Sequence, residues 1–279
     1  MNYEKRRKIE SSVALLLSTL AAVFGLFWLV FILGDVLIHG IGALKPGLFI
    51  HDPTPPGMEG GGLRNAFVGQ LLITACATLI GVPVGILGGT FLAEYARGTR
   101  FAKAISILSD IMVSVPSIVI GTFIYAILVL PVHHFNGWAG AVALAVIMIP
   151  VVLRTTEDML SLVPWTLREA AFALGAPYYK VIVQVVYRGA AAGILTGILL
   201  SIARVAGETA PLLFTSFNNS FYSLNMNGPI SSLTVTIFQY AMGPYDDWHA
   251  QAWAASFVIT FFILILTILG RLIVKWRYK

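Results

Sequence analysis

The chain has 279 residues, of which 58% are hydrophobic and 11% are charged, and it carries a formal net charge of +5 at pH 7. Soluble domains contain about 25% charged residues. The composition therefore excludes an ordinary soluble domain and indicates a polytopic membrane protein. The positive charge indicates topology and contact with anionic lipids rather than nucleic-acid binding. The only cysteine, Cys76, excludes a disulfide framework and is expected to be a small packing residue.

Six apolar runs are long enough to form membrane-spanning helices, which need about 20 residues each. The third and fourth runs are separated by the turn signal at 131–137. The predicted fold is therefore all-α: a polytopic membrane helical bundle with six transmembrane helices. Kinks are expected at Pro83, Pro116 and Pro150. The predicted spans are 11–34, 66–92, 111–132, 135–153, 189–214 and 250–270.

The distribution of cations predicts the orientation of these spans. If the N-terminus is cytoplasmic, fifteen of the 18 Lys and Arg residues lie on the cytoplasmic side, as the positive-inside rule requires. Both termini are then cytoplasmic. The remaining cations are Lys45 and Arg64 outside and Arg204 within a span.

Three polar segments connect the spans: 35–65 and 215–249 outside, and 154–188 inside. The first contains Gly60-Gly61-Gly62, but no Gly-Lys dipeptide occurs in the chain, so a phosphate-binding P-loop is excluded. Any ATP hydrolysis must therefore belong to another polypeptide. Residues 233–241 in the second outer segment predict a short amphipathic helix at the outer surface.

The inner segment predicts a short helix that begins after Pro164 and ends at Gly175 and Pro177. Its sequence from Arg168 to Gly175 reads Arg-Glu-Ala-Ala-Phe-Ala-Leu-Gly. Small alanines let another surface approach closely, which favours a helix that fits into a groove of a partner. The alternative is an interfacial helix that lies on the bilayer.

The fifth span contains Arg204 and Glu208, which are four residues apart and can pair on one helix face. An arginine at the bilayer centre costs about 2.5–3.5 kcal/mol, so these side chains are expected to face protein or water. The same face is expected to continue through Gly193, Gly197 and Ser201, which permit either tight helix packing or a polar lumen. The pair is either a packing device or an oxyanion site in which Glu208 restrains Arg204.

Four segments in order resemble one family of transporters. They are 83–96, 110–121, 168–175 and 203–214, the last reading Ala-Arg-Val-Ala-Gly-Glu-Thr-Ala-Pro-Leu-Leu-Phe. The chain resembles the permease subunits of phosphate-specific ABC importers of type I over roughly residues 65–270. The implied organisation is a first helix and outer loop at 1–65, the importer transmembrane domain at 66–272 and a cytoplasmic tail at 273–279.

The resemblance implies a permease without catalytic activity, cofactor or metal, located in the inner membrane. The implied partners are a separate ATPase subunit, a second permease subunit in a heterodimer, an extracytoplasmic phosphate-binding protein, membrane lipids and inorganic phosphate. Arg204 and Glu208 would line the phosphate path. The ATPase would be contacted by Arg168, Glu169, Ala170, Ala171 and Gly175 of a cytoplasmic coupling helix.

Two alternatives and one departure accompany this resemblance. The alternatives are a permease for another oxyanion or small solute, and an intramembrane enzyme that acts on a lipid phosphate. The departure lies sixteen residues after Glu169, where the family pattern Ile-x-Leu-Pro is replaced by Val185-Val186-Tyr187-Arg188. The missing proline predicts a different geometry at the end of the inner segment.

Overall fold

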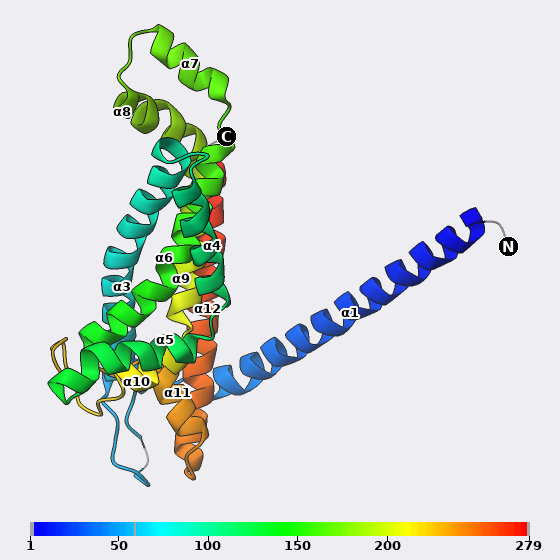
Figure 1. Cartoon of the computed structure of the whole chain (residues 1–279). Helices are drawn as coiled ribbons and strands as arrows, with labels where there is room; N and C mark the ends of the chain where they lie inside the picture. The colour runs from blue at the N-terminus through cyan, green and yellow to red at the C-terminus, as the bar shows by residue number, and fades with distance from the viewer. Residues whose placement is uncertain (1–2, 59, 278–279) are drawn as a thin grey trace.

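A computed structural model describes residues 3–58 and 60–277, and these residues form helices and connecting loops without a strand. The long helices α3, α6, α9 and α12 and the shorter α4 run along the bundle (Figure 1). The segment α7–α8 lies at one end, here called the α7 end, and α5, α10 and α11 lie at the other, the α11 end. The elements are α1 (Tyr3–Ala43), α2 (Gly47–Ile50), α3 (Arg64–Thr90), η1 (Phe91–Tyr95), α4 (Arg100–Ser114), α5 (Ser117–Ile124), η2 (Tyr125–Val129), η3 (Leu130–Val132), α6 (Gly137–Ser161), α7 (Trp165–Ala173), α8 (Tyr178–Val181), η4 (Ile182–Val186), α9 (Tyr187–Ala206), α10 (Ala210–Thr215), α11 (Leu233–Ala241) and α12 (Asp246–Arg277).

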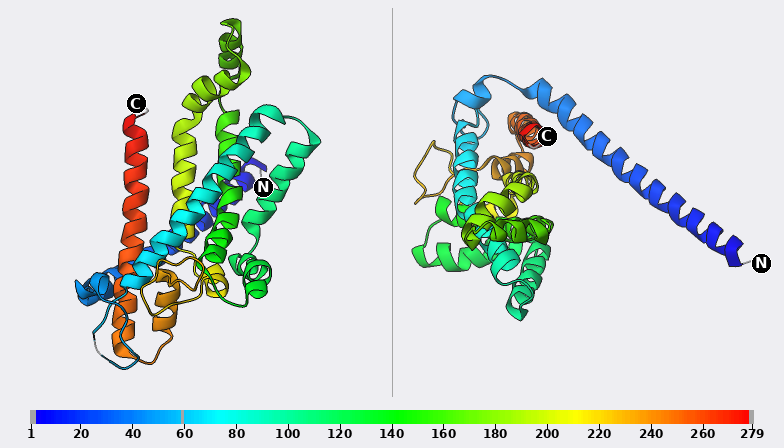
Figure 2. Two further views of the ribbon diagram at one scale, coloured as in Figure 1. Left: turned by 90° about the vertical axis from the view of Figure 1, so that its left-hand side faces the viewer. Right: turned by 90° about the horizontal axis from the view of Figure 1, so that it is seen from above.

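The first helix, α1, projects away from the bundle (Figures 1 and 2). It is 41 residues long and continues through residues 35–43, which were predicted as loop, so that part of the prediction is wrong. Its contact with the bundle is close to its end, where His39 stacks on Trp253 of α12 at a centroid distance of 4.9 Å. A Cβ on Gly40 would lie 2.3 Å from the Phe257 Cβ, so only glycine allows this approach.

Five helices of the described residues are long and apolar enough to cross a membrane, which confirms five of the six predicted spans in kind. The kink predicted at Pro116 is confirmed, and it is sharp enough to divide the third predicted span, 111–132, between two helices. There α4 and the helical stretch Ser117–Val132 meet at an angle of 101°. The bend lies at Pro116, because a proline forces the preceding Val115 into an extended conformation (φ −66°, ψ 132°).

The fifth predicted span, 189–214, is also wrong in its bounds. Helix runs without a break from Tyr178 through α8, η4 and α9 to Ala206, because Arg188 stands where a proline would interrupt it. Gly207 then ends α9, and α10 begins as a separate short helix at Ala210.

The centre of the bundle is α6, against which α3 packs through small residues. A Cβ on Gly85 would lie 2.7 Å from the Val152 Cβ, and one on Gly89 would lie 2.4 Å from the Leu153 carbonyl oxygen. These glycines therefore allow a close contact between α3 and α6. Cys76 packs at the edge of the same core, as predicted.

The helix predicted at 233–241 is α11, with those bounds. Leu233, Val235 and Tyr240 are buried in the α11 end of the bundle, so the helix packs against other helices of the chain. Its polar residues Thr234 and Thr236 are buried too, and their hydroxyls donate to the backbone carbonyls of Glu208 and Ser232. The helix is a structural part of the bundle.

Candidate functional site

Two helices of the bundle are broken, and their short second parts pack together. After the break at Pro116, α5 crosses the α11 end of the bundle, and after the break at Gly207 so does α10 (Figure 1). A Cβ on Gly121 of α5 would lie 2.5 Å from the Pro211 Cα of α10. This contact requires glycine, and it joins two interrupted helices where sequence analysis expected a kink at Pro116 and an unbroken span through Gly207. Interrupted helices are a common way to form substrate sites within membranes.

Arg204 and Glu208 flank the break in α9. Arg204 belongs to the last turn of α9, whereas Glu208 lies beyond the helix, so the predicted shared helix face is wrong at this point. The two still approach: Arg204 Nε lies 4.0 Å from Glu208 Oε1. This distance is longer than a hydrogen bond, and the Arg204 side chain is 43% exposed while that of Glu208 is 17% exposed. The guanidinium is thus only loosely restrained by its carboxylate.

The small residues predicted on the same face pack into α6 instead. A Cβ on Gly193 would lie 2.1 Å from the Met159 Sδ, and one on Gly197 would lie 2.2 Å from the Thr155 Cγ2. Ser201 is buried in the same row. Four residues further along a helix lies Val205, which is buried, while Arg204 is turned aside from this row. Of the two alternatives, tight packing is correct and a polar lumen along these glycines is not.

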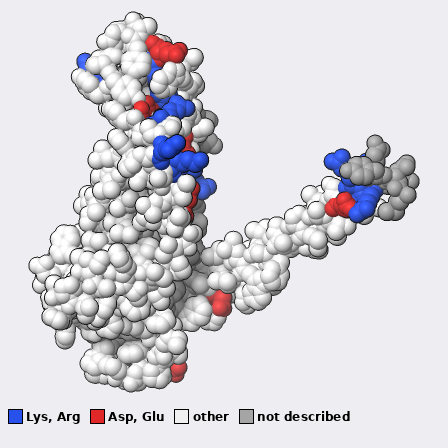
Figure 3. All heavy atoms as spheres, viewed as in Figure 1, with Lys and Arg blue, Asp and Glu red and all other residues white. Residues whose placement is uncertain are grey.

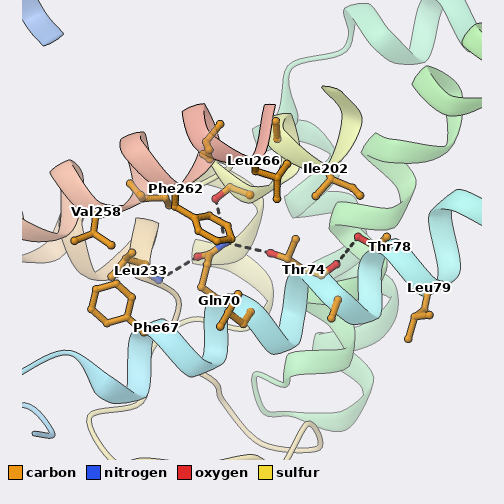
Figure 4. Close-up of a pocket in the computed structure, with 16 residues that line it drawn as sticks. Phe67, Gln70, Thr74, Thr78, Leu79, Ile202, Leu233, Val258, Phe262 and Leu266 are labelled. Atoms are coloured by element: carbon orange, nitrogen blue, oxygen red, sulfur yellow. Dashed lines mark hydrogen bonds between the residues drawn. The ribbon is translucent and has the colours of Figure 1, made fainter. Parts of the chain in front are cut away.

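Gln70 of α3 connects the break in α9 to two other helices (Figure 4). Its Nε2 donates to the carbonyl of Ala206, the last residue of α9, at 3.1 Å, and its Oε1 accepts from the Leu233 backbone N–H at the start of α11 at 3.1 Å. The side chain lies beside an apolar groove of about 510 Å³ formed by α3, α9, α11 and α12. Sequence analysis missed this residue, whose signal is an amide within an apolar span.

The helix α7 stands out from the bundle at the α7 end (Figure 1). Glu169, Ala170 and Leu174 are exposed, and Ala171 is half-buried. The helix ends as predicted: Gly175, at φ +76°, donates to the Phe172 carbonyl at 2.8 Å, and Ala176 donates to the Ala171 carbonyl at 3.2 Å. This pair of bonds is the Schellman arrangement, in which a glycine adopts the left-handed conformation.

Arg168 differs from its neighbours because it is buried, with a side-chain exposure of 1%. It therefore cannot belong to an exposed contact surface, and the prediction that placed it there is wrong. Its Nη2 lies 2.6 Å from Glu94 Oε1, and its Nε lies 3.2 Å from Glu94 Oε2, in a two-pronged ion pair. The guanidinium also donates to the carbonyl of Leu160 in the last turn of α6 (3.0 Å) and to that of Val163, just after α6 (2.7 Å).

Glu94 lies in the π-helical turn η1 at the end of α3, and its side chain is fully buried. Tyr178, the first residue of α8, donates from its hydroxyl to the Glu94 carbonyl at 2.8 Å. Sequence analysis quoted Glu94 only as part of a family segment and missed Tyr178. A carboxylate directly at the end of an apolar run was the signal for Glu94, since a buried carboxylate needs a cationic partner.

A second charged cluster joins α4 to α6. Arg154 Nη1 lies 3.1 Å from Glu157 Oε2, and Arg154 Nε lies 3.6 Å from Asp110 Oδ1. The Ser106 hydroxyl donates to Glu157 at 3.0 Å. These contacts hold the amphipathic α4 against α6, so Asp110 is a helix-packing residue.

Charged side chains gather at two places in the space-filling view: the α7 end and the far tip of α1 (Figure 3). The visible face between the α7 end and the α11 end is almost without them. From Arg204 back to Tyr178 the helix covers 26 residues, or roughly 39 Å at 1.5 Å per residue. The Arg204–Glu208 pair and the α7 segment therefore lie at opposite ends of the bundle.

Comparison with solved structures supports the arrangement. In two crystal forms, a chain of the MetNI methionine ABC transporter in inward-facing conformations is similar to this chain, with TM-scores of 0.59 and 0.56. The first is 20% identical and covers 76% of this chain and 94% of its own. At this identity the likeness shows only that the two chains share a fold.

Curated relatives cover nearly the whole chain. The phosphate transport system permease protein PstA of Pasteurella multocida is 52% identical over 98% of this chain and 97% of its own length. The protein of that name from Haemophilus influenzae is 52% identical over 95% and 94%. A probable phosphate transport system permease protein PstA of Methanocaldococcus jannaschii is 39% identical over 73% of both chains.

The family model named binding-protein-dependent transport system inner membrane component matches residues 81–277. This region contains both broken helices, the α7 segment and the Arg204–Glu208 pair. The match extends over more than half of the chain. The curated relatives are likewise named as transport system permeases. The chain is a multi-pass membrane permease that belongs to the family of binding-protein-dependent transport system inner membrane components.

Proposed function

We propose that the chain is a permease subunit of an ATP-driven importer that carries inorganic phosphate into the cytoplasm. The observation that carries this proposal is the loosely restrained Arg204 at the break in α9. A guanidinium can hold an oxyanion with two hydrogen bonds, and a carboxylate 4.0 Å away competes with the anion and keeps binding weak enough for release. The names of the curated relatives, which are phosphate permeases, support phosphate over other oxyanions.

The ATPase is a separate subunit that docks on α7. Glu169, Ala170 and the exposed Leu174 offer a carboxylate, a close-approach site and an apolar anchor on one short helix. Arg168 is buried and holds α7 against Glu94 and the end of α6, so it does not contact the partner. The α7 end is then cytoplasmic, and so are both termini, in agreement with the cations gathered at that end and at the tip of α1 (Figure 3).

Two further partners belong to the proposed complex in the inner membrane. A second permease subunit forms the other half of the path and covers the Arg204 side chain, which is 43% exposed in this chain. An extracytoplasmic phosphate-binding protein delivers the anion at the α11 end. The family name, which refers to binding-protein-dependent systems, supports this delivery.

The test is phosphate uptake per assembled complex in reconstituted vesicles. Arg204→Gln removes the cation at the break, and loss of a hydrogen bond to a charged group corresponds to a roughly 10- to 150-fold loss of uptake. Arg204→Lys retains charge without the planar fork and is expected to keep an intermediate rate. Arg188→Gln, the same change at an exposed position of the same helix, is the matched control and should transport normally.

Three outcomes separate the alternatives. Normal uptake by Arg204→Gln complexes that are merely less stable identifies the pair as a packing device. Competition of sulfate with phosphate at equal concentration identifies a general oxyanion permease. Turnover of a lipid phosphate by the purified chain without an ATPase would support the intramembrane enzyme.

A further inference from the structure

We infer that α3 transmits movement of the α7–α8 segment to the break in α9, through one buried polar contact near each of its ends. This inference rests on the proposed function, specifically on docking of the ATPase on α7. It assigns roles to Glu94, Arg168, Tyr178 and Gln70. These roles concern the position of other groups: Glu94, Arg168 and Tyr178 hold α7 and α8, and Gln70 holds the end of α9.

The contact at the α7 end is a fixed joint. The Arg168 guanidinium makes four hydrogen bonds, two to Glu94 and one each to the carbonyls of Leu160 and Val163. These bonds connect α7 to the end of α3 and to the end of α6. Since both charged side chains are essentially inaccessible to solvent, either one left alone would be a buried uncompensated charge. The joint therefore persists when α7 moves.

Tyr178 extends this joint across the α7–α8 segment. Its hydroxyl bonds to the Glu94 carbonyl and lies 3.3 Å from Glu94 Oε2, and its ring stacks on Phe172 of α7 at a centroid distance of 5.7 Å. The helix that Tyr178 begins runs on to Ala206. Both ends of the segment, α7 through Arg168 and α8 through Tyr178, are thus attached to Glu94 in η1, the turn that continues α3.

The contact at the other end is the Gln70 amide, which is 7% exposed. It joins α3 to Ala206, the residue directly before the break at Gly207 and two residues after Arg204 (Figure 4). Glu94 and Gln70 are 24 residues apart, or roughly 36 Å along the helix. A displacement of Glu94 along the axis of α3 is therefore delivered to the backbone that carries Arg204.

Between its two contacts α3 cannot bend freely, because its glycines are packed against α6. A Cβ on Gly81 would lie 3.0 Å from the Met148 Sδ, and those on Gly85 and Gly89 would lie still closer to α6 atoms. Close-packed interfaces of this kind transmit strain rather than absorb it. Arg168 also bonds to α6, so α3 and α6 act as one body that α7 moves.

The test measures ATP hydrolysed per phosphate imported by the reconstituted complex. This ratio does not change when a variant only lowers the amount of assembled complex. Glu94→Gln combined with Arg168→Met removes the joint without leaving a buried charge unpaired, and Gln70→Leu removes the other contact. Both should raise the ratio by at least about fivefold, the lower range of allosteric coupling.

Two single variants complete the design. Tyr178→Phe removes one hydroxyl and should raise the ratio less than the double variant does; it provides the measurement if the double variant fails to assemble. Thr78→Val is the matched control on α3, because the Thr78 hydroxyl donates to the Thr74 carbonyl of the same helix at 2.8 Å. Its ratio should equal that of the unmodified complex.

Leu174→Asp separates this inference from the proposed function. If Leu174→Asp weakens ATPase binding while the joint variants couple normally, docking on α7 stands and transmission through α3 is wrong. An unchanged ratio for Gln70→Leu alone would also show that transmission through α3 is wrong. If Leu174→Asp binds the ATPase as tightly as the unmodified chain, α7 is not the docking site, and both proposals fall.

Discussion

Gly175 offers a quantitative test of α7, because its replacement has a conformational cost and no steric one. Its φ is +76°, and a Cβ built on it would have no atom within 4 Å. A residue other than glycine costs about 1–2 kcal/mol in the left-handed region. Gly175→Val should therefore reduce the population of the intact end of α7 by roughly 5- to 30-fold. Affinity for the ATPase subunit should fall by the same factor.

The assay is titration of purified ATPase subunit onto the permease complex in nanodiscs. Gly175→Asn is the conservative variant, since asparagine tolerates the left-handed conformation, and its affinity should stay close to that of the glycine. Gly98→Val is the matched control: Gly98 also has φ +76° and open space around its Cβ position, but it lies in the turn before α4. Equal losses for Gly98→Val and Gly175→Val would refute the reasoning, because the loss would then reflect general destabilisation.

Three further predictions follow from single positions. Leu174 is 89% exposed, so Leu174→Asp should leave the thermal stability of the permease unchanged. It should lower the affinity for the ATPase by at least about tenfold, as expected for an interface anchor. A lowered thermal stability would contradict the prediction. Glu208→Gln frees Arg204, so the half-saturating phosphate concentration and the turnover in vesicle uptake should both fall. If both quantities stay the same, Glu208 does not compete with the anion. Gly121→Val would force its Cβ against the Pro211 Cα and should destabilise the chain by about 1–3 kcal/mol. The control is Gly42→Val in α1, where no atom lies within 4 Å of the Cβ position. Equal melting temperatures for the two variants would contradict the α5–α10 contact.

Sequence alone predicted the features that depend on local composition. Apolar runs predicted the long helices, and Gly175 with Pro177 predicted the end of α7, because a left-handed glycine and a proline act on their immediate neighbours. The α11 bounds were predicted from apolar pattern in the same way. These elements need no knowledge of what they pack against.

The features that sequence analysis missed depend on contacts between distant segments. The kink at Pro116 was predicted, but its angle of 101° and the break at Gly207 depend on room for α5 and α10 to turn, which neither residue alone reveals. The burial of Arg168 depends on Glu94, which lies 74 residues away. A local pattern places Arg168 beside the exposed Glu169 and cannot distinguish the two.

The meeting of α1 with α12 has a consequence for biosynthesis. Gly40 contacts Trp253 and Phe257, so the contact that positions the first helix forms only after the last helix has been made. At about 5–20 residues per second, synthesis of the intervening chain takes roughly 10–40 s. During that time α1 stands in the membrane without its partner in the chain. A chain truncated before α12 would keep α1 in this unattached state.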